Sequence, residues 1–158
     1  MTNKLPDYDF LGSVYLGTKG NELEESLLSI KLQTLKPKNI IIIIDGFIKK
    51  EVKTIINKYS LYLPIKTIPI KQNLGLGLAL RKGLKECKSK IVLRFDTDDI
   101  NVKERALEQV KEITESNIDI VGSNIYEFND NKEKIINQKV MPLSHNNIKK
   151  SIIFRNPI

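Results

Sequence analysis

The sequence predicts an α/β fold with a mainly parallel central sheet and helices on both faces of it. Two largely apolar runs, 39–44 (NIIIII) and 91–95 (IVLRF), have the composition of strands buried on both sides, which is typical of parallel sheets covered by helices. Segments with helical spacing of apolar residues alternate with such runs, and this alternation indicates βαβ crossover units. The length of 158 residues fits a single domain, 1–158.

The expected strands are short β-branched segments that end in polar or turn-forming residues. The five isoleucines 40–44 are too β-branched for an isolated helix and too apolar for an exposed strand, so we expect a central strand there. The other expected strands cover 11–16, 65–70, 91–95 and 118–128. Turn chemistry at 129–131 predicts a small β-hairpin that returns through 135–140.

The expected helices are amphipathic segments with capping residues at their starts. Asn21, with Glu24 three residues later, is the expected N-cap of the first helix, which Pro37 limits. Ser144 is the expected cap of a short last helix. The remaining helical patterns cover about 49–59, 76–87 and 102–113. Cys87 lies on the apolar side of the third, and we interpret it as a small core residue rather than a nucleophile.

The charge pattern argues against nucleic acid as a partner. The net charge is +7, but 22 of the 26 basic residues are lysines, whereas phosphate and base recognition favours arginine. The lysines are scattered rather than clustered in a stripe. No apolar run approaches the ~18–20 residues that a membrane span needs. Because the N-terminus also lacks the features of a signal peptide, we expect a cytoplasmic location, with attraction to an anionic membrane surface as an extension.

Three of the eight aspartates fall within four residues, directly after the apolar run 91–95. Packing Asp96, Asp98 and Asp99 so closely costs free energy unless a cation neutralises them. Carboxylate oxygens select hard ions such as Mg2+ or Mn2+, which bind through one or two carboxylates plus substrate phosphates. The cluster therefore predicts a metal and diphosphate site. The alternative is that Asp98 or Asp99 only caps the following helix.

Ligands of such sheets bind beyond the carboxyl ends of the strands. Three polar features of the sequence come directly after expected strands: the turn 17–21, the Asp45-Gly46 pair and the aspartate cluster 96–99. We therefore expect all three at one rim of the sheet.

Five segments in this order resemble the nucleotide-sugar-binding half of the family-2 inverting glycosyltransferases of GT-A fold. They are SVYLGTKGNE, IIIIDG, NLGLGLALRKG, RFDTDD and DIVGSN, and the resemblance runs from about residue 12 to 158. It implies transfer of a sugar from a nucleotide diphosphate sugar, expected to be a UDP-sugar, to an acceptor hydroxyl with inversion. The cofactor implied is Mn2+ or Mg2+.

The resemblance also implies roles for individual residues. Asp98 would be the principal metal ligand, with Asp96 and Asp99 supporting it and Asp96 also facing the ribose and donor sugar. Asp45 would face the base, where a carboxylate can accept the N3–H of uracil. The remaining implied nucleotide contacts are Gly17, Thr18, Lys19 and Glu22 in the first turn, and Asn73 and Gly75 in a loop over the nucleotide.

In the resembled family the general base comes from a later segment, so we expect it beyond Ile158 and treat the chain as truncated before the acceptor-binding region. The implied partners are a nucleotide-sugar donor and a saccharide or lipid-linked saccharide acceptor, in the biosynthesis of bacterial cell-surface polysaccharide. Peripheral membrane association would suit the lipid-linked acceptor. The competing hypothesis is a non-catalytic nucleotide-binding module.

Overall fold

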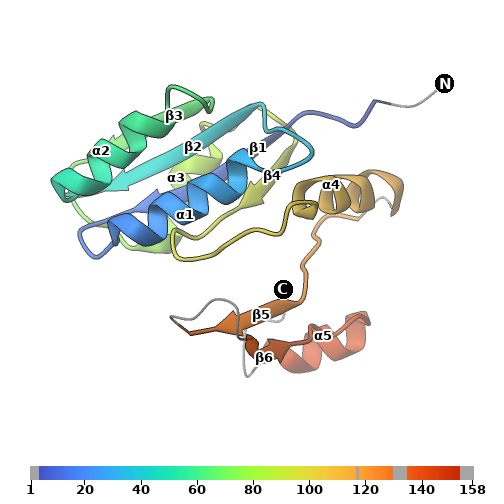
Figure 1. Cartoon of the computed structure of the whole chain (residues 1–158). Coiled ribbons are helices and arrows are strands. Elements are labelled where there is room, and N and C mark those ends of the chain that lie inside the picture. The colour runs from blue at the N-terminus through green and yellow to red at the C-terminus, as the bar shows by residue number, and fades with distance from the viewer. Residues whose placement is uncertain (1–3, 117, 130–134, 154–158) are drawn as a thin grey trace.

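A four-stranded, wholly parallel sheet in the order β3–β2–β1–β4 forms the centre of the protein (Figure 1). The computed structural model describes residues 4–116, 118–129 and 135–153. The strands of the sheet are β1 (Tyr8–Val14), β2 (Asn39–Asp45), β3 (Ile65–Ile70) and β4 (Ile91–Arg94). The helices that connect and follow them are α1 (Gly20–Lys31), α2 (Lys50–Tyr59), α3 (Leu76–Leu84) and α4 (Arg105–Ser116). The α/β class and the mainly parallel sheet expected from the sequence are confirmed.

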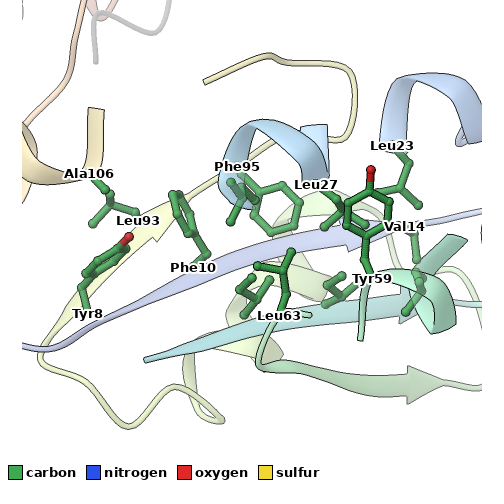
Figure 2. Packing of buried hydrophobic residues seen from close by; sticks show 14 of the residues in the cluster. Tyr8, Phe10, Val14, Leu23, Leu27, Tyr59, Leu63, Leu93, Phe95 and Ala106 are labelled. Atoms are coloured by element: carbon green, nitrogen blue, oxygen red, sulfur yellow. The ribbon is translucent and has the colours of Figure 1, made fainter. Parts of the chain in front are cut away.

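The larger part of the core lies on the face of the sheet that α1, α2 and α4 cover. Alternate residues of each strand point to this face, because successive side chains of a strand lie on opposite sides. Phe10 contacts Tyr8 and Phe95 edge-on, with ring centroids 5.5 and 6.0 Å apart. Figure 2 shows Leu27 of α1 next to Phe95, and Leu23 of the same helix next to Tyr59.

In the part of the chain that the structure describes, α3 covers the opposite face of the sheet, so helices do lie on both faces as expected (Figure 1). Leu11, Ile41 and Ile43 pack here against Ala79 of α3. Cys87 lies partly buried against this cluster, and burial raises the pKa of its thiol to about 11. Cys87 thus packs against apolar residues as expected, although α3 ends at Leu84, before Cys87, and the cysteine is only partly buried.

The strand order creates a switch point between β1 and β4. From β1 the chain continues to β2 and β3 on one side, and then returns to place β4 on the other side of β1. The helix that follows β1 covers one face, and the helix that precedes β4 covers the other. A crevice beyond the carboxyl ends of the strands at such a point is where open α/β sheets bind ligands.

A small antiparallel sheet and a short helix follow the main unit and form a separate group in Figure 1. The sheet pairs β5 (Ile125–Phe128) with β6 (Ile135–Lys139), and the helix is α5 (His145–Ser151). The expected hairpin is thus confirmed, although turn residues 130 and 131 lie outside the described residues. Ser144 caps α5 as expected, since its hydroxyl accepts a hydrogen bond from the Asn147 N–H at 3.3 Å.

Several boundaries differ from those expected. The first strand covers 8–14 rather than 11–16, because the polar residue Asp9 is buried within it and fully hydrogen-bonded. The N-cap of α1 is Lys19, not Asn21, and no side chain caps that end. The fifth strand covers only 125–128 rather than 118–128, since residues 118–124 pair with no other strand of the described chain.

None of the helices in the described part of the chain combines the length and apolar character that crossing a bilayer requires.

Candidate functional site

A pocket of about 410 Å³ opens at the switch point, beyond the carboxyl ends of β1, β2 and β4. It lies towards the α3 face of the sheet. Side chains alternate between the two faces along a strand, and the strand residues that line the pocket lie an even number of positions from those that pack against α3. Its lining residues are Ser13, Tyr15, Asp45, Asn73, Gly75, Leu76, Arg94, Asp96, Thr97 and Asp98. Five residues implied by the sequence, Asp45, Asn73, Gly75, Asp96 and Asp98, are thus brought together from three separate segments.

Asp45 organises the loop that precedes α3. Its buried carboxylate accepts hydrogen bonds from the backbone N–H of Leu74 at 2.8 Å and of Gly75 at 3.0 Å. The loop also approaches the backbone closely at Gly46, whose φ is +81° and where an added Cβ would lie 2.8 Å from the Asn73 nitrogen. Both oxygens of Asp45 therefore already serve the loop, and its contact with a base stays a prediction.

The aspartate cluster lies at the end of β4, next to two arginines. Arg94 holds Asp96 by a bidentate ion pair, with Nη2 at 2.7 Å from both carboxylate oxygens. The partly buried Arg105 donates from its guanidinium to the Arg94 carbonyl at 2.8 Å and to the Asn101 side chain. Partial burial, together with the like charges of Asp96 and Asp98, raises the pKa of the Asp99 carboxyl above its ordinary value.

Polar side chains of α1 fasten the segment that carries the cluster. Ser26 donates to the Asp96 carbonyl at 2.9 Å, and the Ser29 hydroxyl accepts from the Asn101 backbone N–H at 3.0 Å. Gln33 is fully buried, donates to the Val102 carbonyl at 2.8 Å and accepts from the Ala106 N–H at 2.9 Å. Sequence reasoning missed these residues, because their partners lie about 70 positions away along the chain.

The first turn follows shortly after the lining residue Tyr15. The pocket lining does not include the four turn residues implied by the resemblance, Gly17, Thr18, Lys19 and Glu22. Thr18 is buried and closes the turn: its hydroxyl accepts from the Tyr15 N–H at 3.0 Å, and its N–H donates to the Tyr15 carbonyl at 3.1 Å. Lys19 and Glu22 form an ion pair of 2.8 Å on the surface. Their nucleotide contacts stay predictions, and Tyr15 is the side chain of this region that reaches the pocket.

Three further observations bear on metal binding. Asp96 and Asp98 line the pocket whereas Asp99 does not, and the described residues contain no group of three or more His, Cys, Asp or Glu side chains placed to hold an ion. The donor set thus fits an ion that takes one or two carboxylates and completes its shell with phosphate oxygens and water, as Mg2+ commonly does. The alternative in which Asp98 or Asp99 caps the next helix is wrong, because α4 begins only at Arg105.

Comparison with known proteins decides the family. The family model "Glycosyl transferase family 2" matches residues 15–157, which is most of the chain. This chain belongs to glycosyl transferase family 2. The family assignment expected from the five segments is therefore confirmed, and the pocket at the switch point is the candidate functional site of this family-2 chain.

Relatives of this family-2 chain include transferases of known name. The chain is 35% identical over 153 residues to the amylovoran biosynthesis glycosyltransferase AmsE of Erwinia amylovora, covering 95% of the chain and 56% of that protein. It is also 35% identical over 161 residues to the UDP-Gal:alpha-D-GlcNAc-diphosphoundecaprenol beta-1,3-galactosyltransferase of Escherichia coli, covering 99% of the chain and 57% of that protein. The chain thus spans somewhat more than half the length of these two relatives.

Solved structures confirm the GT-A fold. TarS of S. aureus superposes with a TM-score of 0.62 at 24% identity, covering 70% of this chain and 20% of that chain. A mannosyltransferase of Pyrobaculum calidifontis, solved with GDP-Man and Mn2+, superposes with a TM-score of 0.53 at 17% identity, covering 61% of this chain and 28% of that chain. At these identities the likeness concerns the fold alone.

Five lining residues were not expected from the sequence: Ser13, Tyr15, Leu76, Arg94 and Thr97. Strand periodicity contained a usable signal for Arg94, because residues two apart in a strand lie on one face and Asp96 was already a candidate. The same alternation relates Ser13 and Tyr15 to Leu11, whose side chain packs under α3.

Proposed function

We propose that the chain is the donor-binding part of a glycosyltransferase that moves a sugar from a UDP-sugar to an acceptor hydroxyl with inversion, using Mn2+ or Mg2+. The observation that carries this proposal is that Asp96 and Asp98 share one pocket with Asp45 and the loop before α3 that Asp45 holds, in a chain of family 2. Carboxylates for a metal and a backbone loop for a nucleotide are the two elements that a diphosphate donor needs.

The choice of uridine as the base rests on relatives. The name of the E. coli galactosyltransferase states a UDP-Gal donor, and TarS of S. aureus has been solved with UDP and with UDP-GlcNAc. The mannosyltransferase neighbour was solved with GDP-Man, which makes guanosine the competing base. Uridine is preferred because the galactosyltransferase is the more similar protein, at 35% identity against 17%.

The proposed metal site uses Asp98 as the principal ligand and Asp96 as the second, with Asp99 beside them. When bound, the divalent cation would neutralise the charge that develops on the departing nucleoside diphosphate. Asp98 is exposed and lines the pocket, whereas the Arg94 guanidinium constrains Asp96. Ser26 and Gln33 hold the backbone of this segment so that its carboxylates face the pocket.

The acceptor is proposed to be a saccharide linked to a membrane lipid. The acceptor named for the E. coli relative carries a diphosphoundecaprenol group, and AmsE is named for amylovoran biosynthesis. Such an acceptor would bring the protein to a membrane surface, and a net charge of +7 would favour an anionic one. Inversion would follow from direct attack of the acceptor hydroxyl on the anomeric carbon. We assign the general base to no residue of this chain.

Thermal unfolding with UDP, in the presence and absence of Mn2+, tests the proposal. A ligand that binds only the folded state stabilises it by about 2.7 kcal/mol at a hundredfold excess over its dissociation constant. We expect a Mn2+-dependent rise in Tm with UDP that Asp98→Ala abolishes. Asp119→Ala is the matched control, because Asp119 is an exposed carboxylate that does not line the pocket.

Other outcomes decide between functions. A larger shift with GDP than with UDP would replace uridine by guanosine, and no shift with any nucleoside diphosphate would contradict the donor site. A UDP shift without sugar transfer by a protein of the relatives' full length, tested on lipid-linked saccharides, would favour a non-catalytic nucleotide-binding module.

A further inference from the structure

The Arg94–Asp96 pair places a positive charge inside the candidate donor pocket. Arg94 is the last residue of β4, and Asp96 follows two residues later with its side chain on the same side. The guanidinium contacts both carboxylate oxygens: Nη2 is 2.7 Å from each, and Nε is 3.1 Å from Oδ1. Such fork-shaped pairing satisfies a carboxylate with a fixed geometry, and so an ion approaching Asp96 meets a guanidinium already in place.

The same pair is open to exchange. The side chains of Arg94 and Asp96 are 48% and 35% exposed, and ion pairs in that environment contribute little because water screens them. Arg105, in contrast, is partly buried and donates to the Arg94 carbonyl, Asn101 and Gln109, so it is held in place. Of these two arginines, only Arg94 lines the pocket.

We propose that Arg94 is a built-in counter-cation that competes with the divalent metal for Asp96, and that its guanidinium turns to the diphosphate when the metal takes Asp96. The inference rests on the proposed function, since it assumes that the pocket takes a metal and a diphosphate. The metal ion and the Arg94 guanidinium would repel each other if both contacted the Asp96 carboxylate. An additional anion beside them reduces this repulsion. The diphosphate supplies that anion, and a guanidinium binds phosphate oxygens in the same forked manner as a carboxylate.

This arrangement predicts that replacing Arg94 changes the affinities for metal and for nucleotide in opposite directions. Arg94→Gln removes the competitor, so the nucleotide-free protein should bind Mn2+ more tightly, by roughly two- to fivefold for an exposed ion pair. The same substitution removes the diphosphate contact that Arg94 makes once the metal has taken Asp96, so UDP should bind more weakly at saturating Mn2+. A residue that only stabilised the fold would weaken both ligands when replaced. Opposite signs therefore identify the proposed role.

The experiment measures Mn2+ binding to the full chain by the loss of the free-ion EPR signal, and UDP binding by calorimetry with and without saturating Mn2+. The variants are Arg94→Gln, Arg94→Gln with Asp96→Asn, and Arg81→Gln. Arg81 lies on α3 and does not line the pocket, so its replacement controls for the loss of one positive charge. Circular dichroism and Tm establish that each variant is folded.

Tighter Mn2+ binding in Arg94→Gln but not in Arg81→Gln, reversed by adding Asp96→Asn, supports the inference. Unchanged or weaker Mn2+ binding in Arg94→Gln overturns it, as does unchanged UDP binding. If the wild type binds UDP while neither the wild type nor Arg94→Gln binds Mn2+, the competition between Arg94 and the metal is refuted, and the nucleotide site remains as a site without a metal. If the wild type binds Mn2+ but no nucleoside diphosphate under any condition, the proposed function fails, and the turn of Arg94 to a diphosphate fails with it.

Discussion

The ring of Phe95 occupies the space where a side chain at Gly12 would lie. A Cβ built on Gly12 would be 2.5 Å from Cε1 and Cζ of Phe95, which is closer than non-bonded carbon atoms approach one another in proteins. Phe95 is buried, and its N–H donates to the Leu11 carbonyl at 3.0 Å, so the ring and the backbone both join the end of β4 to β1. Because Asp96 follows directly, this contact sets where the aspartate cluster begins.

Replacing Gly12 should therefore disturb the site as well as the core. We expect Gly12→Ala to lower the free energy of unfolding by about 1–3 kcal/mol, as overpacking does in close-packed interiors, and to weaken UDP and Mn2+ binding. Gly77→Ala is the control: it lies in α3 with no atom within 4 Å of an added Cβ, and alanine there should stabilise by up to about 1 kcal/mol. Urea unfolding of both variants checks this, and a neutral Gly12→Ala would contradict the contact.

Asp45→Asn should loosen the loop before α3. The amide has one acceptor oxygen in place of two, and its NH2 group would face a backbone N–H, so one of the bonds to Leu74 and Gly75 is lost. We expect a cost of about 1–3 kcal/mol in unfolding free energy and a higher Kd for UDP. Asp7→Asn, which breaks an exposed ion pair with Lys38, should change the free energy of unfolding little, because water screens the pair, and should leave the Kd unchanged. Equal stability losses in the two variants would count against the loop role of Asp45.

Ser26→Ala should act on ligand binding more than on stability. The hydroxyl of Ser26 donates to the Asp96 carbonyl across 70 positions of sequence, whereas Ser60 donates to Ile56 at the end of its own helix. Each substitution should cost about 1 kcal/mol of unfolding free energy. Only Ser26→Ala should weaken Mn2+-dependent UDP binding, because it alone releases the backbone of the aspartate cluster. The Kd for UDP in both variants, measured by calorimetry, distinguishes the two serines.

Acid should destabilise the protein through Asp9, at the opposite rim of the sheet. Burial by itself would raise the pKa of Asp9, but hydrogen bonds from Ser89, Asn39 and Lys88 outweigh it, and the pKa lies below its ordinary value. A lowered pKa means that stabilisation is complete above the unfolded-chain pKa of about 3.9 and is lost as the pH falls towards the folded pKa. Urea midpoints of wild type and Asp9→Asn should therefore differ most near pH 6 and converge below about pH 4. A gap that stays constant would mean that Asp9 titrates alike in both states.

The sequence alone determined the fold class and the rim on which the site lies. The isoleucine run 40–44 and the apolar run before Asp96 are local patterns, and parallel strands joined by helices must end at one edge of a sheet. The polar residues that follow those strands, Asp45 and Asp96 among them, therefore came to one pocket as expected. Family resemblance, based on the order of five segments, was equally within reach of the sequence.

The tertiary structure alone decided what each of these side chains contacts. Asp45 serves a loop almost 30 positions away, Arg94 rather than another aspartate is the neighbour of Asp96, and buried Ser26 and Gln33 hold the aspartate segment from α1. Periodicity assigns a residue to a face of a strand or helix, but a hydrogen bond needs two groups within about 3 Å. That proximity arises only when the helices pack on the sheet, which is why a serine and a glutamine on a helix that looked merely amphipathic turned out to support the site.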